Sequence, residues 1–146
     1  MTVGHRLPVD DAACPTGSGR SGRLPDRSGS AQNGGMRLEL TLDCCDLERT
    51  ARFWQDAVGL HLDGTIEDRY VSLSGHGVVL TLQRVVEPKV VKNRMHLDLL
   101  VQDLEQEVAR LEQLGASRVS PAPLHEFGQT WYVLADPDGN EFCLHA

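Results

Sequence analysis

The stretch "MHLDLLVQDLE", residues 95–105, decides the fold, because the chain carries a second version of it at residues 38–48, "LELTLDCCDLE". Leucines recur at matching places, and both stretches close on Asp-Leu-Glu. The alternating leucines predict a strand with one buried face, and the closing aspartate is placed to cap a helix. One position differs in kind, since Glu39 in the first copy stands where the second copy has His96.

Each copy of the repeat continues with an amphipathic helix and then with further strands. Asp46 precedes "LERTARFWQDAVG" and Asp103 precedes "LEQEVARLEQLG", and in both segments apolar residues recur at helical spacing before a closing glycine. Strands are predicted in "RYVSLSG", "VVLTLQRV", "QTWYVLA" and "EFCLHA", with short ones near "HLDG" and "SRVS". His125 and Glu126 are assigned to a loop. Each unit is therefore βαβββ, and because one helix cannot cover both faces of a small sheet, the two units must pack together.

The composition describes an acidic globular protein. The 146 residues carry a formal net charge of -7, with 24% charged and 40% hydrophobic residues, so neither nucleic acid nor an anionic membrane is an expected partner. No apolar run approaches the roughly 18 residues of a membrane span, and no secretory signal is recognised. The four cysteines form no CxxC pair and show no disulfide spacing, which predicts a cytoplasmic protein.

Residues 1–35 differ from the rest of the chain. They hold seven of the 14 glycines, three of the seven prolines and no aromatic residue. Such a segment cannot bury enough apolar surface to offset its ordering entropy, so a disordered tail is expected. The folded domain is then 36–146, with a first module at about 36–88 and a second at about 92–146.

Three stretches carry a resemblance to a known family: "DCCDLERTARFWQDAVGL", "KNRMHLDLLVQDLEQEVARLEQLGASRV" and "LADPDGNEF". Together they resemble the vicinal oxygen chelate superfamily, which includes glyoxalase I, extradiol dioxygenases, fosfomycin-resistance enzymes and bleomycin-resistance proteins. The resemblance covers essentially all of 36–146. It implies an α+β fold in which two βαβββ modules form a cupped, incomplete mixed β-barrel with the helices outside. It also implies a divalent metal in the cup, a small-molecule ligand and a homodimer.

The resemblance also implies which residues hold the metal. The first-strand ligand lies seven residues before the capping aspartate, which selects His96 and Glu39. The last-strand ligand of the second module lies four residues after the DPDG glycine, where this chain has Cys143 instead of the family's glutamate. Glu141, two residues earlier, shares its strand face, as does His145.

In the first module Gln83 is the best counterpart of Cys143, with Thr81 on the same side of its strand. The implied metal ligands are therefore Glu39, Gln83, His96 and Cys143. A thiolate in this set would favour zinc, and the set lacks the two histidines and one carboxylate of a non-haem iron oxygenase. The plainer alternatives are a hydrogen-bonded core histidine at His96 and a small buried hydrophobe at Cys143.

Three functions remain open from the sequence. One is a metal-dependent lyase or isomerase, in which Glu39 and His96 would be the catalytic residues. The alternative is a protein of the bleomycin-resistance type, which sequesters a small molecule without converting it. A third is a metal-free enzyme that uses Glu39 and His96 as a general acid–base pair. In each case Trp131 or Tyr132 is expected to place an aromatic ring in the cup.

Overall fold

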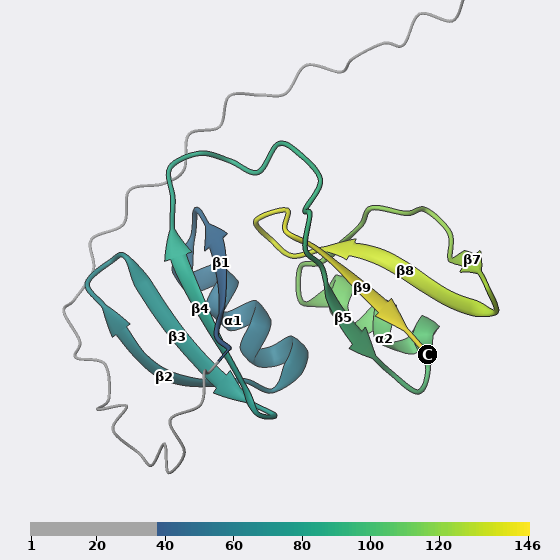
Figure 1. Cartoon of the computed structure of the whole chain (residues 1–146), viewed down its shortest axis with the longest axis horizontal. Coiled ribbons are helices and arrows are strands. Elements are labelled where there is room, and N and C mark those ends of the chain that lie inside the picture. The colour runs from purple at the N-terminus through teal and green to yellow at the C-terminus, as the bar shows by residue number, and fades with distance from the viewer. Residues whose placement is uncertain (1–37) are drawn as a thin grey trace, which may run out of the picture.

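The computed structural model describes residues 38–146, and the tail expected at 1–35 lies outside that range. Two similar units follow one another along the chain (Figure 1). The first contains β1 (Leu40–Cys44), α1 (Leu47–Val58), β2 (His61–Ile66), β3 (Tyr70–Gly75) and β4 (Val78–Arg84). The second contains β5 (Leu97–Leu100), α2 (Leu104–Gln113), β6 (Ser117–Arg118), β7 (Leu124–Glu126), β8 (Gln129–Ala135) and β9 (Glu141–His145).

Each unit builds its own mixed sheet. The strand order is β1-β4-β3-β2 in the first sheet and β5-β9-β8-β6 in the second, with β7 also paired to β8. The first strand of each unit runs parallel to the last, and the other pairs are antiparallel. The expected α+β fold of two paired modules is confirmed, and the two sheets do not close into a barrel. The loop assigned to His125 and Glu126 was wrong, because both residues belong to β7.

Both helices begin at the aspartates that the repeat singled out. The Asp46 and Asp103 carboxylates each accept a hydrogen bond at 3.0 Å from the backbone N–H three residues later. Helix α1 ends at Gly59, whose φ of 72° is the left-handed conformation that glycine adopts without strain. The repeated Asp-Leu-Glu therefore marks the same helix start in both units.

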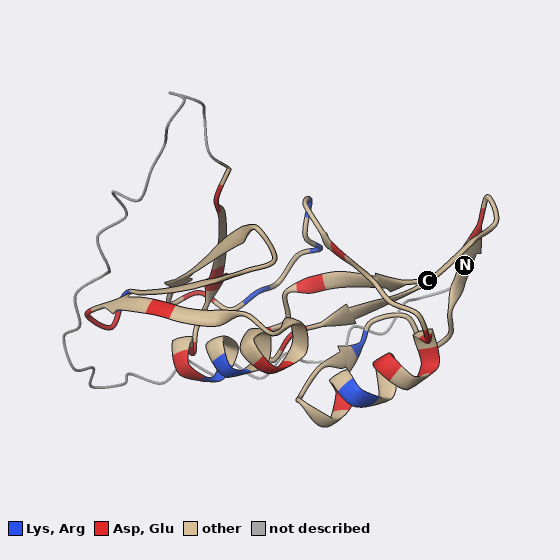
Figure 2. Cartoon of the chain, turned by 90° about the horizontal axis from the view of Figure 1, so that it is seen from below, with Lys and Arg blue, Asp and Glu red and all other residues tan. Residues whose placement is uncertain are grey.

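One hydrophobic core joins the two units. Trp54 of α1 packs edge-on against Phe53 of the same helix and against Phe142 of β9, with ring centroids 5.3 and 5.4 Å away. Both helices lie on the same side of the two sheets (Figure 2). Arg110 of α2 reinforces that arrangement, because its guanidinium donates hydrogen bonds at 3.0 and 2.6 Å to two backbone carbonyl oxygens at the end of α1. Within residues 38–146, neither helix covers the opposite face of the two sheets (Figure 2).

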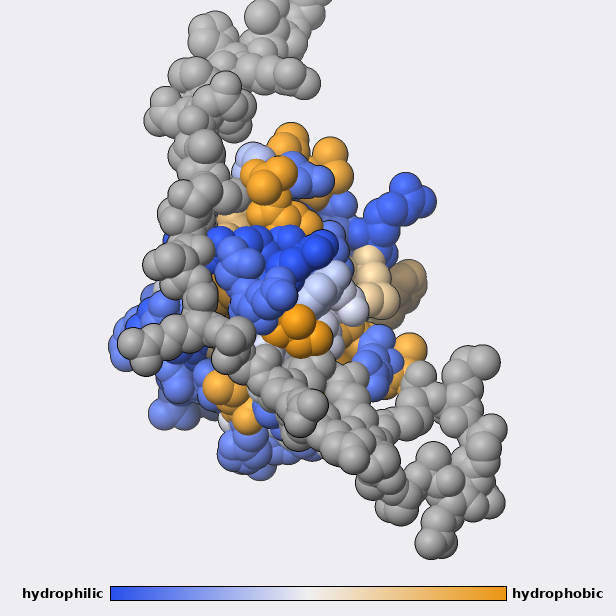
Figure 3. Space-filling model, turned by 90° about the vertical axis from the view of Figure 1, so that its left-hand side faces the viewer, coloured by the Kyte–Doolittle hydropathy of each residue, from blue (hydrophilic) through white to orange (hydrophobic). Residues whose placement is uncertain are grey.

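The surface beside β2 has no single large apolar area on the face that Figure 3 shows. Hydrophobic residues there form separate groups between hydrophilic ones. Leu62 of β2 is 53% exposed. Within residues 38–146, neither helix has the length and apolar character needed to cross a membrane.

Candidate functional site

The second sheet carries polar side chains on the face that points away from the core. The neighbours of Cys143 in β9 are buried, so strand alternation places Cys143 and His145 on the opposite face, as expected from the sequence. The register adds Asp98 of β5 beside Cys143 and Trp131 of β8 beside His145. We call this surface of β5, β8 and β9 the open face of the second sheet.

A cavity of about 360 Å³ lies on the open face. Its lining comes from β5, β8 and β9: Asp98, Gln129, Trp131, Cys143 and His145. The volume is at the lower end of the roughly 300–1,000 Å³ typical of small-molecule sites. Trp131 supplies the expected aromatic ring, whereas Tyr132 is buried and its hydroxyl donates to Glu105 Oε1 at 2.8 Å. An indole ring surrounded by hydrogen-bonding groups is a suitable lining for a small organic molecule.

A second cavity, of about 410 Å³, lies beside the linker between the two units and the turn between β8 and β9. Although it is larger, the side chains of Asp138 and Asn140 in its wall are already hydrogen-bonded within the protein. Much of the remaining wall is aliphatic linker: Val85, Pro88, Val90 and Val91. We therefore place the candidate ligand site on the open face of the second sheet.

His96 and Cys143, two of the predicted metal ligands, are in contact. His96 directly precedes β5, and its Nδ1 lies 3.8 Å from Cys143 Sγ. Its Nε2 lies 3.1 Å from the backbone carbonyl oxygen of Asn93. Because a carbonyl oxygen only accepts, this contact assigns the ring proton to Nε2 and leaves Nδ1 as an acceptor facing the thiol.

Cys143 is held as a protonated thiol. Burial raises the pKa of the Cys143 thiol, and the negative charge and hydrogen-bonding oxygen of Asp98 raise it further. Lys92 acts in the opposite direction, but its effect on this pKa is smaller than that of Asp98. Since the thiolate is the nucleophilic form of cysteine, Cys143 is not activated for nucleophilic attack.

The other two predicted metal ligands belong to the first sheet. Glu39 directly precedes β1 and has an exposed side chain. Gln83 lies on β4, half-buried, opposite Asp43 of β1. The structure therefore brings His96 and Cys143 together on the second sheet and leaves Glu39 and Gln83 on the first.

The strand register corrects one step of the sequence comparison. Thr41 holds the same place in the first copy of the repeat as Asp98 does in the second. Thr41 pairs with Thr81, whereas Asp98 pairs with Cys143. Thr81 is therefore the counterpart of Cys143, and the choice of Gln83 for that place was wrong by two residues.

The described residues supply only part of a metal centre. The contact of His96 with a backbone carbonyl is the kind that orients metal-binding histidines, but a zinc site takes three or four protein ligands. Within residues 38–146, no group of three or more His, Cys, Asp or Glu side chains is arranged to hold a metal ion. The donors present among these residues therefore do not fit a complete metal centre.

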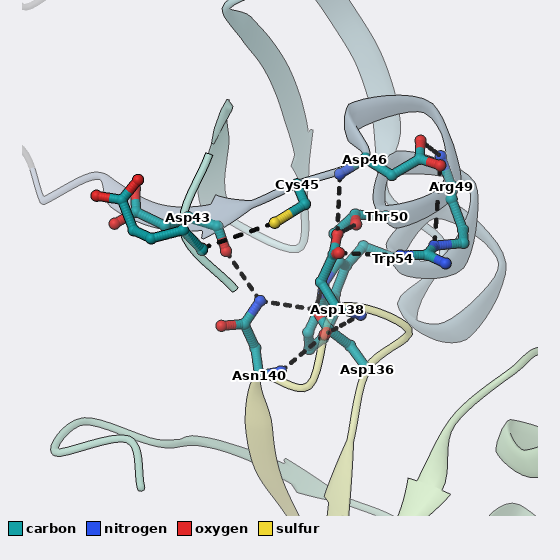
Figure 4. Close-up of polar contacts among 10 residues, drawn as sticks. Asp43, Cys45, Asp46, Arg49, Thr50, Trp54, Asp136, Asp138 and Asn140 are labelled. Carbon is teal, nitrogen blue, oxygen red and sulfur yellow. Dashed lines mark hydrogen bonds and ion pairs between the residues drawn. The ribbon is translucent and has the colours of Figure 1, made fainter. Parts of the chain in front are cut away.

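A second cluster of polar groups joins the two units at the DPDG turn (Figure 4). The Asp138 side chain is 6% exposed and lies against the start of α1. It accepts hydrogen bonds from the backbone N–H of Asp46 at 3.3 Å, from Arg49 Nη2 at 2.9 Å and from the hydroxyl of the fully buried Thr50. A carboxylate at a helix N-terminus also stabilises the helix dipole. Asp138 thus links the last turn of the second unit to the helix of the first.

The neighbouring Asp136 organises the same turn from inside. Its carboxylate accepts backbone N–H groups of Asp138 and Asn140, both at 2.9 Å, and Trp54 Nε1 at 3.2 Å. Burial raises the pKa of the Asp136 carboxyl, while the hydrogen bonds from Asn140 oppose that rise. These contacts assign Asp136 and Asp138 a structural role that the local sequence does not reveal.

Three cavity residues were absent from the predicted site: Asp98, Gln129 and His145. His145 could have been included, because strand alternation places it on the same face as Cys143. Asp98 needed the register of β5 against β9, and Gln129 needed the pairing of β7 with β8. Neither of these strand pairings can be predicted from a pattern in the local sequence.

Comparison with known proteins assigns the chain to a family. A family model described as a glyoxalase-like domain matches residues 39–145, and the chain belongs to that family. This confirms the resemblance to the vicinal oxygen chelate superfamily. A search among curated proteins finds no match.

Solved structures share the fold at low sequence identity. A glyoxalase-related enzyme from Fulvimarina pelagi is 23% identical over 75% of this chain and 86% of its own, with a TM-score of 0.59. Lactoylglutathione lyase from Agrobacterium tumefaciens is 17% identical over 75% and 92%, with a TM-score of 0.57. A mutant of the fosfomycin resistance protein FosX from Listeria monocytogenes, complexed with Mn(II) and 1S,2S-dihydroxypropylphosphonic acid, is 18% identical over 78% and 90%, with a TM-score of 0.64. At these identities the likeness shows the fold.

Proposed function

We propose that this protein binds a small organic molecule on the open face of the second sheet and sequesters it without metal-dependent conversion. The observation that carries the proposal is the cavity of about 360 Å³, in which Trp131 and four hydrogen-bonding side chains converge from three strands. A wall built on strands is rigid, and a preorganised wall reduces the entropy lost on binding. The fold supports the small-molecule part of this proposal, because the related FosX mutant is complexed with 1S,2S-dihydroxypropylphosphonic acid as well as Mn(II).

Sequestration is favoured over conversion by the state of the nearby residues. Burial and the charge of Asp98 raise the pKa of the Cys143 thiol, which disfavours its use as a nucleophile, and Nδ1 of His96 faces that thiol. Glu39, the other half of the predicted catalytic pair, belongs to the first sheet. A metal-dependent lyase or isomerase that uses Glu39, Gln83, His96 and Cys143 stays a prediction, as do the homodimer and the cytoplasmic location.

A neutral fluorescent probe, N-phenyl-1-naphthylamine, tests the proposal. We expect its emission to rise saturably with one site per chain, and Trp131→Ala to weaken binding about tenfold or more, because the indole forms the apolar wall. Leu62→Ala is the matched control, since it removes an exposed apolar side chain from the other sheet. Binding that Leu62→Ala weakens as much as Trp131→Ala would place the probe elsewhere and refute the site.

A further inference from the structure

The cavity on the open face contains one carboxylate that lacks an ion-pair partner. Asp98 is exposed, and within residues 38–146 no lysine or arginine forms a salt bridge with it. Its neighbour Glu141 makes the contrast clear, because Lys89 Nζ lies 3.1 Å from that carboxylate. No lysine or arginine is among the described residues that line the cavity. Asp98 therefore provides an uncompensated negative charge at the cavity.

The aromatic wall of the cavity also lacks a cation. Among the described residues, Arg69 lies over the Tyr70 ring at 5.9 Å and Arg118 lies over the Tyr132 ring at 5.0 Å. Within residues 38–146 no lysine or arginine lies over the Trp131 ring, although indole is the side chain that attracts cations most strongly. Within the described residues, the cavity therefore combines a carboxylate and an indole ring, two groups that attract cations, and neither has a lysine or arginine partner.

We propose that the ligand of this cavity is an organic cation: an ammonium or amidinium group joined to a flat apolar body. The cationic group is neutralised by the Asp98 carboxylate, and the apolar body stacks on Trp131. Gln129 and His145 add hydrogen-bonding groups to the lining of the cavity. The inference rests on the proposed function, since it names the class of molecule that the same cavity binds.

Three naphthalene probes of similar size and different charge test the class. They are (1-naphthylmethyl)trimethylammonium, 1-naphthalenemethanol and 1-naphthylacetate, each titrated by calorimetry into the full chain. We expect the cation to bind about tenfold or more tightly than the other two, because it adds a charge pair and a cation–π contact. Added salt should weaken the cation most, because partly exposed charges are screened.

Two variants separate charge from packing. Asp98→Asn should weaken the cation about fivefold to tenfold and leave the neutral probe unchanged, because only charge is removed. Asp68→Asn makes the same chemical change at an exposed acid on the first unit and should alter neither probe. Circular dichroism and thermal midpoints check that both variants fold.

The possible outcomes test separately whether the ligand is a cation and whether it binds in the cavity on the open face. If all three probes bind equally and Trp131→Ala weakens each of them, the location of the binding site is supported and the preference for a cation is refuted. Tighter binding of 1-naphthylacetate would also refute the preference for a cation, because the charge of Lys92 would then favour an anionic ligand. If the cation prefers this protein but Asp98→Asn has no effect, the inference fails as well. Failure of all three probes to bind would instead contradict the proposed function.

Discussion

The contact between Asp138 and the start of α1 allows a quantitative prediction about stability. Asp138→Ala removes the acceptor for three donors, two of which, the Thr50 hydroxyl and the Asp46 N–H, lie at a protected interface. Each buried donor left without a partner costs about 1–3 kcal/mol, and the lost charge at the helix N-terminus costs about 0.3–1 kcal/mol. The ion pair with Arg49 adds little, because the Arg49 side chain is 52% exposed.

The expected loss is about 3 kcal/mol in the free energy of unfolding, which corresponds to a fall of roughly 10 °C in thermal midpoint for a domain of this size. Urea titration followed by circular dichroism measures the free energy, provided that the slope m stays constant. Asp103→Ala is the matched control, because Asp103 caps α2 with one hydrogen bond from Gln106 and reaches no other unit. We expect about 1 kcal/mol for that change.

A double-mutant cycle tests whether the Thr50 contact carries part of the effect. Thr50→Val keeps the shape of the side chain and removes the hydroxyl donor. We expect Asp138→Ala and Thr50→Val to be non-additive by about 1 kcal/mol or more, since they remove the same hydrogen bond. Additive changes, or a cost for Asp138→Ala no greater than that for Asp103→Ala, would refute the assignment of Asp138 as the link between the units.

Two further predictions concern the sulfur and metal chemistry. Burial, followed by the charge of Asp138, raises the pKa of the Cys44 thiol to about 12, so iodoacetamide at neutral to mildly alkaline pH should label Cys44 only after unfolding. Peptide mapping measures this, and equal labelling rates with and without urea would contradict the burial. Elemental analysis of untagged protein should find far less than one zinc per chain, and His96→Ala or Cys143→Ser should weaken the residual zinc binding, because each removes one of two donors in contact. Tight stoichiometric zinc that Glu39→Gln abolishes would show instead that the predicted four-ligand site assembles.

The repeat made the fold predictable, because the signals that define its helices and strands come from residues close together in the sequence. Asp46 and Asp103 mark helix starts through side chains that bond only three residues ahead, and alternating leucines mark the buried strand faces. The same locality explains the failure at β7. Its three residues are all exposed and lack alternation, and the strand exists because β8 offers it a partner.

The site depended on pairings that are distant in sequence. His96 and Cys143 are 47 residues apart, and their approach was expected only from the family resemblance, which placed one by its distance from the capping aspartate and the other by its distance from the DPDG turn. The mismatch of Gln83 arose because β4 and β9 share little sequence beyond the matched Leu82 and Leu144, so the register was needed to select Thr81. The role of Asp138 was hidden for the same reason, because its partner Thr50 lies 88 residues earlier.

The chain has two tryptophans, and their indole N–H resonances test the central claim most directly. Trp54 Nε1 donates to Asp136 inside the core, whereas Trp131 lines the cavity on the open face. During titration with N-phenyl-1-naphthylamine, the account predicts a saturable shift of the Trp131 signal, assigned from its loss in Trp131→Phe, while the Trp54 signal stays in place. A stationary Trp131 signal at probe concentrations that saturate binding would contradict the account.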